Sequence, residues 1–372
     1  MINIDSTTVA VETSEELKEI LEGNNEITLI YLAKDIALTR GISILTTKKT
    51  ITIDGLYPTD GTGTIHTYTD MSSAESGDAI GVRGTSSINV IVQNLNVIGR
   101  NYYGIIYVPD GTAYQNIVIA YKNITYTGPQ ITYHPSGLSI YENLDITIVD
   151  STANSAFWFR GSASSPYLEI LEGAEVSLTT TRDVVYTASY LNISIGKNAS
   201  FIINTKYGFF RDKGHQASNI LVDENSKFSV TQTNSNAAMI SCRGDFTINE
   251  NATLLLKANF STTSPLIRFV TTSAKFNITK PKSIILYNQT GNCFTFENQT
   301  AFNITAGRID YWQTSPTLSE SGEITGKSLY SWNKLTSENI IINTTQISLK
   351  TTIVSNNLTT EEIAQMPSLD LL

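Results

Sequence analysis

Acidic and histidine side chains are the residues of this sequence that could carry hydrolytic or metal-assisted chemistry. Asp78 is a candidate calcium ligand, but calcium takes six to eight oxygens and no partner carboxylates occupy the same position in the following repeats. Asp145 and Asp150 lack the acidic neighbours that a glycan hydrolase needs across the scissile bond. The three histidines show no catalytic-triad or metal-ligand spacing: His66, His134 and His215. We expect no catalytic residue, no cofactor and, apart from the candidate Asp78, no metal ligand.

Aromatic and basic side chains that recur about once per repeat could instead bind a ligand. Aromatic rings stack on the apolar faces of sugars, and arginine pairs in bidentate fashion with carboxylate or sulfate groups. We expect one outer face of the molecule to carry His134, Trp158, Arg160, Phe209, Arg211, Arg243 and Arg268. Such a face would bind an anionic glycan or a cell-surface protein. The open alternative is a wall covered by loops at 127–137 or 154–166, with Trp158 buried beneath them.

Short strands that repeat with a period of about 27 residues must position these side chains. Each repeat has an alternating strand, a polar pair, a turn residue and a second strand. The turn residue is mostly Asn or Gly, which tolerate the left-handed backbone conformation. The turn column is Asn94, Asn123, Asn143, Gly173, Asn198, Asn225, Asn251, Lys282 and Gly307. This pattern predicts an all-β, single-stranded parallel β-helix of about nine or ten coils, with asparagines hydrogen-bonded from coil to coil.

A second column with a similar period predicts which strand faces point inward. It consists of Tyr107, Tyr133, Phe159, Tyr186, Phe210, Cys242, Phe269 and Phe296. Two residues earlier lie Ile105, Ile131, Phe157, Val184, Gly208, Ile240, Ile267 and Phe294. Strand side chains alternate faces, so both columns should fill the interior and their immediate neighbours should point outward. Cys242 and Cys293 lie about two coils apart, too far for a bridge, and we expect two free thiols.

The ends of the chain show features that cap a stack of coils. Thr13 and Glu16 form a capping box, so the sequence predicts a short helix at about 13–22 over the N-terminal end. Residues 55–80 interrupt the period and predict a long loop. The repeat fades after about residue 316. We therefore expect the β-helix, with its cap, to span 1–316, and 317–372 to form a C-terminal cap or a junction to a following domain.

Composition narrows the range of partners. The formal net charge is -9 and only 16% of residues are charged, which opposes nucleic-acid binding. No apolar run of about 18 residues is present, so we expect no membrane insertion. The sequence has neither a signal peptide nor a wall-anchoring signal, and we expect a monomeric fragment of a larger surface protein.

The N-terminal third resembles the pectate lyase-like adhesive domains of Gram-positive bacterial surface proteins. The residues that carry the resemblance are 11–17 (VETSEEL), 30–35 (IYLAKD) with Ile36, and 50–55 (TITIDG). The likeness is clearest over about residues 9–100, and the coil pattern extends it to about 316. It implies a right-handed β-helix and a binding role at an extracellular, bacterial cell surface. The segment around Asp78 is also similar to a calcium-binding segment of pectate lyases, but no catalytic arginine segment accompanies it.

Three classes of function follow from these observations. A non-enzymatic adhesin-type module that binds a glycan or a cell-surface ligand fits best. A polysaccharide lyase or glycoside hydrolase on the same fold is the alternative, and a purely structural stalk is the third. A cluster of carboxylates would favour the enzyme, an exposed basic and aromatic face the binding module, and a fully covered face the stalk.

Overall fold

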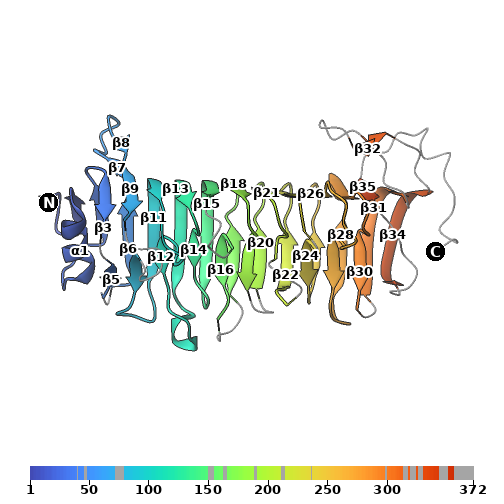
Figure 1. The fold of residues 1–372 in the computed structure, drawn as a ribbon, viewed down its shortest axis with the longest axis horizontal. Helices are drawn as coiled ribbons and strands as arrows, with labels where there is room; N and C mark the ends of the chain where they lie inside the picture. The colour runs from blue at the N-terminus through green and yellow to red at the C-terminus, as the bar shows by residue number, and fades with distance from the viewer. Residues whose placement is uncertain are drawn as a thin grey trace. The chain divides into compact units, whose positions relative to one another are not determined.

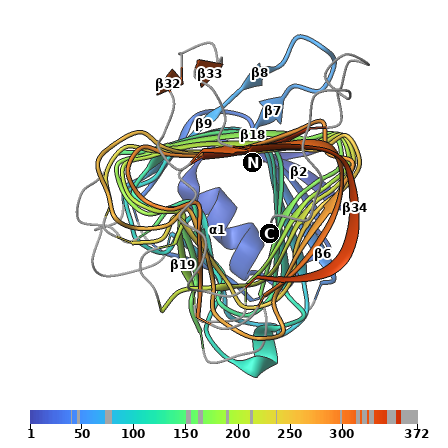
Figure 2. The same cartoon turned by 90° about the vertical axis from the view of Figure 1, so that its right-hand side faces the viewer.

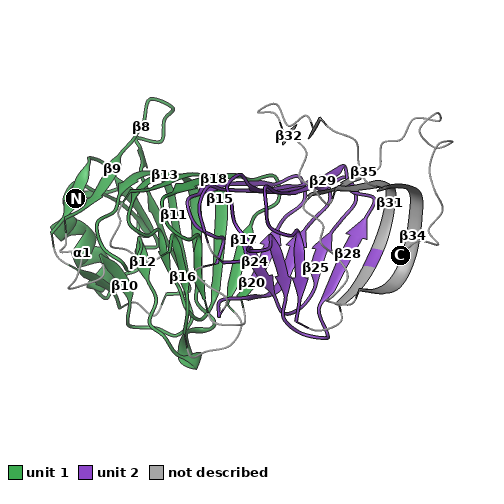
Figure 3. Cartoon of the chain, turned by 45° about the vertical axis from the view of Figure 1, so that its right-hand side comes forward, with its two compact units in different colours: residues 1–191 green, residues 192–372 purple. Residues whose placement is uncertain are grey.

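The computed structural model describes the chain except for residues 40, 46–47, 72–78, 150–154, 162–165, 188–190, 211–213, 236, 298–299, 313–316, 319–323, 326–329, 343–350 and 356–372. The protein is mostly β, with 51% strand and 4% helix, and contains a parallel β-solenoid of about 9 turns. The predicted fold class is confirmed. The chain divides into two compact units, which Figure 3 colours separately: unit 1, residues 1–191, and unit 2, residues 192–372.

Unit 1 is built from long strands and from a sheet of short strands. The long strands β11 (Asn89–Ile98), β13 (Val118–Gly128) and β15 (Leu138–Ile148) pair in parallel and lie side by side in Figure 1. The short strands form a parallel six-stranded sheet: β5 (Ile42–Ile44), β10 (Ile80–Val82), β12 (Ile106–Tyr107), β14 (Thr132–Tyr133), β16 (Phe157–Phe159) and β19 (Val185–Thr187). The other elements are β1 (Ile2–Asn3), β2 (Thr8–Val11), β3 (Leu29–Leu32), β4 (Ile36–Leu38), β6 (Thr50–Asp54), β9 (Thr67–Asp70), the 3₁₀ turn η1 (Thr112–Tyr114), β17 (Tyr167–Ile170) and β18 (Glu175–Thr180).

Unit 2 repeats the parallel arrangement and ends in antiparallel pairs. Its parallel strands, beginning with β20 (Leu191–Ile195) at the boundary, are β21 (Ser200–Thr205), β22 (Ala217–Val222), β23 (Lys227–Gln232), β24 (Ile240–Cys242), β25 (Phe246–Ile248), β26 (Thr253–Ala258), β27 (Ile267–Phe269), β28 (Lys275–Thr279), β29 (Ser283–Asn288), β30 (Phe294–Phe296) and β31 (Thr300–Trp312). Antiparallel partners follow: β34 (Tyr330–Ile342) and β35 (Thr351–Ser355) pair with β31, and β32 (Thr317–Leu318) with β33 (Ile324–Thr325). The division of the chain at residue 316 stays a prediction.

The turn column adopts the left-handed backbone conformation that the sequence predicts. Positive φ angles between 50° and 73° occur at Asn94, Asn123, Asn143, Gly173, Asn198, Asn225 and Asn251. The prediction is wrong at Lys282, because the residue with positive φ is Lys280, at 39°. Gly307 lies within β31, whose side chains are outside the described part of the chain. Left-handed backbone at these sites follows from residue type, since Asn and Gly tolerate it best.

Asparagine side chains in unit 1 also hydrogen-bond between coils, as predicted. Asn123 Nδ2 donates to Asn94 Oδ1 at 2.9 Å, and Asn143 Nδ2 donates to Asn123 Oδ1 at 3.2 Å. Asp54 accepts a hydrogen bond from Asn94 Nδ2 at 3.0 Å at one end of this ladder, and Asn143 Oδ1 accepts one from the Glu175 N–H at the other. The side chain of each turn asparagine therefore hydrogen-bonds to that of the next coil, and these bonds fix how successive coils stack.

The interiors of the two units differ in chemistry. Unit 1 buries Tyr68, Tyr121, Tyr126 and Tyr141 and several small polar groups. The buried aromatic residues of unit 2 are mostly phenylalanines, and some of them stack from coil to coil: the Phe269 and Phe296 rings lie 5.8 Å apart and nearly parallel. The two cysteines, Cys242 and Cys293, are buried and are not joined in a disulfide, as predicted.

The predicted inward column is correct in unit 2 and wrong for three tyrosines of unit 1. Phe159, Phe210, Cys242, Phe269 and Phe296 are buried, but Tyr107, Tyr133 and Tyr186 align with Trp158 on the outer side of the sheet. The cause lies at the corner before each short strand, where two consecutive residues both point inward, as Ile131 and Thr132 do. When the alternation of inward and outward side chains is counted from the corner residue, it is wrong by one position. An error of one position assigns every side chain of the strand to the opposite face.

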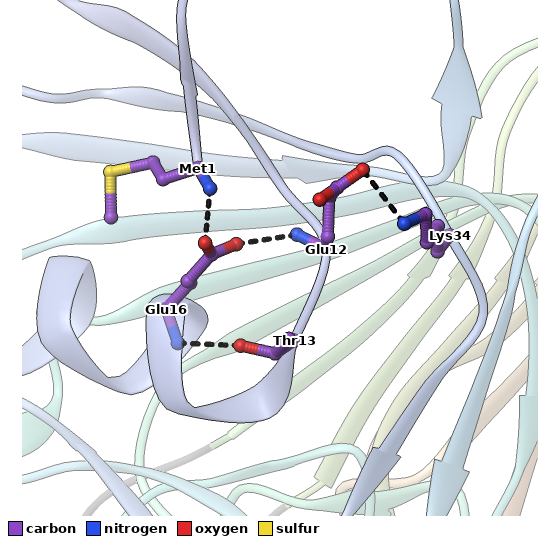
Figure 4. Close-up of polar contacts among 5 residues, drawn as sticks. All are labelled: Met1, Glu12, Thr13, Glu16 and Lys34. Carbon is purple, nitrogen blue, oxygen red and sulfur yellow. Dashed lines mark hydrogen bonds and ion pairs between the residues drawn. The ribbon is translucent and has the colours of Figure 1, made fainter.

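A helix, α1 (Ser14–Glu22), covers the N-terminal end of unit 1, as predicted (Figure 2). Thr13 caps it, because its Oγ1 accepts a hydrogen bond from the Glu16 N–H at 3.2 Å. The Glu16 carboxylate accepts from the Glu12 N–H at 2.7 Å (Figure 4), and it also interacts with the Thr13 backbone, as in a capping box. The same carboxylate contacts the Met1 amino group, and Lys34 Nζ lies 3.0 Å from Glu12 Oε1 (Figure 4). Leu17, Ile20 and Leu21 form its buried face.

The predicted loop at 55–80 is partly ordered into strands. It contains the antiparallel hairpin of β7 (Leu56–Tyr57) and β8 (Thr64–Ile65), which projects from the coils of unit 1 in Figures 1 and 2. Strand β9 follows, and its pairing with β11 returns the chain to the solenoid. Residues 72–78 of this segment, with the candidate ligand Asp78, lie outside the described residues.

Candidate ligand-binding surface

Four aromatic side chains form a continuous column on the outer side of the six-stranded sheet in unit 1. The parallel register aligns Tyr107 with Tyr133, Tyr133 with Trp158, and Trp158 with Tyr186. The corresponding ring centroids are 5.1, 5.4 and 4.3 Å apart. Tyr107, Tyr133 and Trp158 are partly exposed and Tyr186 is 7% exposed. We refer to these four residues as the aromatic column.

Neighbouring rings of the aromatic column are in contact, but only one pair is stacked: the Tyr107–Tyr133 and Trp158–Tyr186 planes are tilted by 43° and 58°. The Tyr133 and Trp158 planes differ by only 15°, which is a stacked arrangement. The rim of an aromatic ring carries partial positive charge and therefore attracts oxygen acceptors. Burial, together with Tyr107, Tyr103 and Asp110, raises the pKa of the Tyr133 hydroxyl to about 12, so this group stays a neutral hydroxyl at physiological pH.

An arginine lies at each end of the aromatic column. The Arg83 guanidinium is 5.4 Å from the centre of the Tyr107 ring, and that of Arg160 is 5.2 Å from the centre of the Tyr186 ring. Arg160 Nη1 also donates to the Tyr186 hydroxyl, and both arginines are exposed. The column therefore combines exposed aromatic rims with two cations, although the chain as a whole carries a net charge of -9.

Two of the predicted binding residues, Trp158 and Arg160, lie on this surface. The indole N–H of Trp158 donates to the Arg160 carbonyl at 3.1 Å, which fixes the ring against the strand end. His134, by contrast, is inside the coil and fully buried, so its predicted outward position is wrong. It directly follows Tyr133, the last residue of β14, and points inward because Tyr133 points outward. Its Nδ1 is 2.9 Å from Ser139 Oγ, and burial lowers its pKa to about 3.

The predicted residues of unit 2 do not form a comparable surface. Phe209 is buried, with its ring 4.9 Å from that of Phe210 and 5.7 Å from that of Phe228, so its predicted outward position is also wrong. Arg268 Nε donates to Glu297 Oε1 at 2.9 Å, and this ion pair neutralises its charge. Arg243 is partly exposed, and Arg211 lies outside the described residues.

Tyr107, Tyr133, Tyr186 and Arg83 were missed as surface residues from the sequence. The feature that marks them is a pair of buried residues, of which the second is the first residue of its strand: Ile105 and Ile106, Ile131 and Thr132, Ala156 and Phe157, Val184 and Val185. When the second member of each pair is taken as the first inward strand position, the aromatic residue that follows it must point outward.

The described residues offer little for catalysis. Among them, no group of three or more His, Cys, Asp or Glu side chains could hold a metal ion. Burial raises the pKa of the Cys242 thiol to about 12, which keeps it protonated and a poor nucleophile. No helix among the described residues is long and apolar enough to cross a membrane.

Comparisons with known proteins gave one family match and two similar solved structures. Residues 8–133, from β2 to β14, match the sequence model of a family described as "Putative pectate lyase-like adhesive domain". Two solved structures align with 79% of this chain: "L. reuteri 53608 SRRP", at 17% identity and a TM-score of 0.45 over 96% of its length, and "L. reuters 100-23 SRRP", at 13% identity and 0.42 over 84%. No curated protein matches. The predicted resemblance is confirmed over residues 8–133, which match the sequence model of the pectate lyase-like adhesive domain family.

Proposed function

We propose that this chain is a non-enzymatic adhesin-type binding module of an extracellular protein at a bacterial cell surface, and that the aromatic column of unit 1 binds an extended anionic glycan. One observation carries the proposal: four aromatic rings in register on the outside of a sheet, with an arginine at each end. Exposed contiguous aromatic surface on a soluble domain commonly marks an interaction site.

The spacing of the column suits a polymer. Successive coils of a parallel solenoid are about 4.8 Å apart, so equivalent side chains form a straight, regular track. The centroid spacings of 4.3 to 5.4 Å along the column follow this repeat, which is comparable with the repeat of an extended polysaccharide. Neighbouring sugar units can therefore meet equivalent side chains on neighbouring coils.

The charges favour an acidic chain. Arg83 and Arg160 offer guanidinium groups that can pair with carboxylate or sulfate in two parallel hydrogen bonds. The rims of the rings attract the same oxygens. Because the chain is acidic elsewhere, an anionic ligand is repelled from most of the surface and attracted to this track. An acidic cell-surface protein is the second candidate ligand.

Binding to uronate polymers tests the proposal directly. We would measure the affinity of the purified chain for polygalacturonate, alginate and hyaluronate, and for methyl-esterified polygalacturonate, which keeps the backbone but lacks the charge. We expect the acidic forms to bind more tightly, and affinity to fall with added salt, because exposed charges are screened within about 8–10 Å at physiological ionic strength.

Two variants and a control locate the site. Trp158→Ala and Arg160→Glu should each weaken binding, while Tyr167→Ala should not, since Tyr167 is an exposed tyrosine on β17, outside the six-stranded sheet. Equal affinity in all of these variants would place the ligand elsewhere. The alternative function, a polysaccharide lyase or glycoside hydrolase, is checked in the same samples: new unsaturated or reducing chain ends would overturn the non-enzymatic assignment.

A further inference from the structure

Tyr103 is an aromatic residue beside the column that does not belong to it. Its ring centroid is 5.2 Å from that of Tyr107 and 5.3 Å from that of Tyr133, with interplanar angles of 76° and 64°. The Tyr107 and Tyr133 rings are themselves 5.1 Å apart, too close to admit a third ring between them. Tyr103 therefore lies beside both rings, with its plane steeply inclined to each of them.

This orientation gives Tyr103 a property that the column lacks. Each column ring contacts the next ring along the coils, whereas the plane of Tyr103 is steeply inclined to those of Tyr107 and Tyr133, so Tyr103 does not continue the column. Tyr103 is partly exposed. An aromatic face that is open to solvent can stack on the C–H groups of a sugar ring, which the rim of an aromatic ring cannot do.

A buried polar contact from the preceding coil holds the segment that carries Tyr103. Asp70, at the end of β9, is 3% exposed, and its Oδ2 accepts hydrogen bonds from Asn101 N at 3.1 Å and Asn101 Nδ2 at 2.5 Å. Asn101 Oδ1 in turn accepts from the Tyr103 N–H at 2.7 Å. The next residue, Gly104, has a φ of 72° and bridges to Thr132, which brings the chain into β12.

The contact between Asp70 and Asn101 is more polar than packing alone requires, which indicates that the position of the Tyr103 segment matters. A buried carboxylate is costly unless it is hydrogen-bonded, and here both Asn101 donors are used to satisfy it. The Asn101 side chain is therefore held at both of its polar atoms: Nδ2 donates to Asp70, and Oδ1 accepts from the backbone N–H of Tyr103. Such support from neighbouring residues is what keeps a binding side chain in a single orientation.

We propose that Tyr103 is a stacking platform for one pyranose ring of the ligand, and that Asp70 and Asn101 act as positioning residues for it. This inference rests on the proposed function and makes it more specific: the two arginines and the ring rims recognise negative charge, and Tyr103 recognises the sugar ring itself. The ligand class is an acidic polysaccharide whose pyranose rings carry an unbroken patch of C–H groups on one face. An acidic polypeptide has the charge but offers no such ring.

The test compares ligands that share charge and differ in ring content. Affinities of the full chain would be measured for polygalacturonate, alginate and hyaluronate, and for poly-L-glutamate of similar length. For the tightest uronate polymer we expect Tyr103→Ala to lower affinity about tenfold, Tyr103→Phe to retain it, and Tyr167→Ala to leave it unchanged. Affinity for poly-L-glutamate should be weaker than for that polymer and should not respond to Tyr103→Ala.

A double-mutant cycle tests the positioning role. Asn101→Ala should weaken uronate binding in the wild-type background, yet add nothing when Tyr103 is already alanine, because Asn101 would act through that ring. Thermal unfolding followed by circular dichroism would show that each variant is folded at the temperature of the binding measurement. If Asn101→Ala does not fold, Tyr103→Ala still tests the platform, because its ring lies on the surface.

The outcomes separate this inference from the proposed function. Binding that depends on Trp158 and Arg160 but not on Tyr103 would overturn the platform and leave the proposed function intact. Losses that multiply in the double mutant would overturn the positioning role of Asn101. Tighter binding of poly-L-glutamate than of every uronate polymer would identify an acidic protein as the ligand and overturn the sugar assignment. No binding to any uronate polymer would overturn both proposals.

Discussion

Stability of unit 1 should depend on pH through His134, a buried histidine with no charged partner. Its contacts are neutral: Ser139 Oγ lies 2.9 Å from Nδ1, Gly137 packs beside Nε2, and Nε2 has no hydrogen-bond partner among the described residues. Loss of solvation on burial lowers its pKa from 6.5 to about 3. The imidazole is therefore neutral in the folded protein and takes up a proton only when the coil opens.

The sign and size of the effect follow from this difference in pKa. Because the folded pKa is lower than the unfolded one, the unfolded state binds more protons between the two values, and acid favours unfolding. The contribution of His134 is fully present above pH 6.5 and is lost as the pH falls. Each pH unit between the two pKa values costs roughly 1 kcal/mol, so at pH 4.5, two units below 6.5, the loss is about 2–3 kcal/mol.

Urea denaturation at several pH values between 7.5 and 4.5, followed by circular dichroism, measures this loss. His134→Asn is the matched variant, because its amide can replace Nδ1 as the partner of Ser139 but does not titrate. We expect the free energy of unfolding of the wild type to fall by about 2–3 kcal/mol more than that of the variant over this range. His66 and His215 are present in both proteins, so their contributions cancel. Equal pH dependence in the two proteins would refute the reasoning.

Three further predictions concern the faces of the strands, the turns and the thiols. Phe159→Ala should destabilise by about 3–5 kcal/mol because it opens a cavity inside the coil, whereas Trp158→Ala, one residue away on the outer face, should cost clearly less; chemical denaturation of the pair checks the assignment of faces. Asn225→Ala should cost about 1 kcal/mol, since alanine tolerates the left-handed turn poorly, and the same denaturation curves would reveal a neutral effect if the turn were unimportant. Cys242 and Cys293 should resist a thiol reagent in the folded protein and react after unfolding without any reductant; rapid reaction in the native state would contradict their burial.

The cap and the turns could be read from the sequence because they depend on local chemistry. Thr13 is a good helix N-cap wherever a helix follows it, and the structure places it there. The wrong prediction at Lys282 shows the same dependence on local chemistry. No Asn or Gly marks this turn, so only the period of the repeat indicates its position, and the period points two residues beyond Lys280, where φ is positive. The additional hydrogen bond from the Glu12 N–H to the Glu16 carboxylate could not be placed from a motif, because the path of the preceding chain decides this partner.

The candidate site was predicted only in part. Trp158 and Arg160 lie on the outer face as expected, but His134 and Phe209 are buried, and the three tyrosines that complete the column were assigned to the interior. Tyr103 was not considered, because nothing in its local sequence shows that it will meet two rings from neighbouring coils. Its position depends on Asp70, which is 31 residues away from Asn101 in the chain.

The sequence by itself determined that the chain coils, where each coil bends, and that an aromatic residue recurs once per coil. These features follow from residue type and period, since left-handed turns select Asn and Gly and a repeat of about 27 residues predicts a solenoid. Only the tertiary structure decided on which side of the wall each aromatic ring lies. A shift of one residue in register exchanges the inner and outer faces of a strand. The corner sets this register, because Ile131 and Thr132 both point inward there. At the corner, packing against neighbouring coils overrides the simple alternation of a strand.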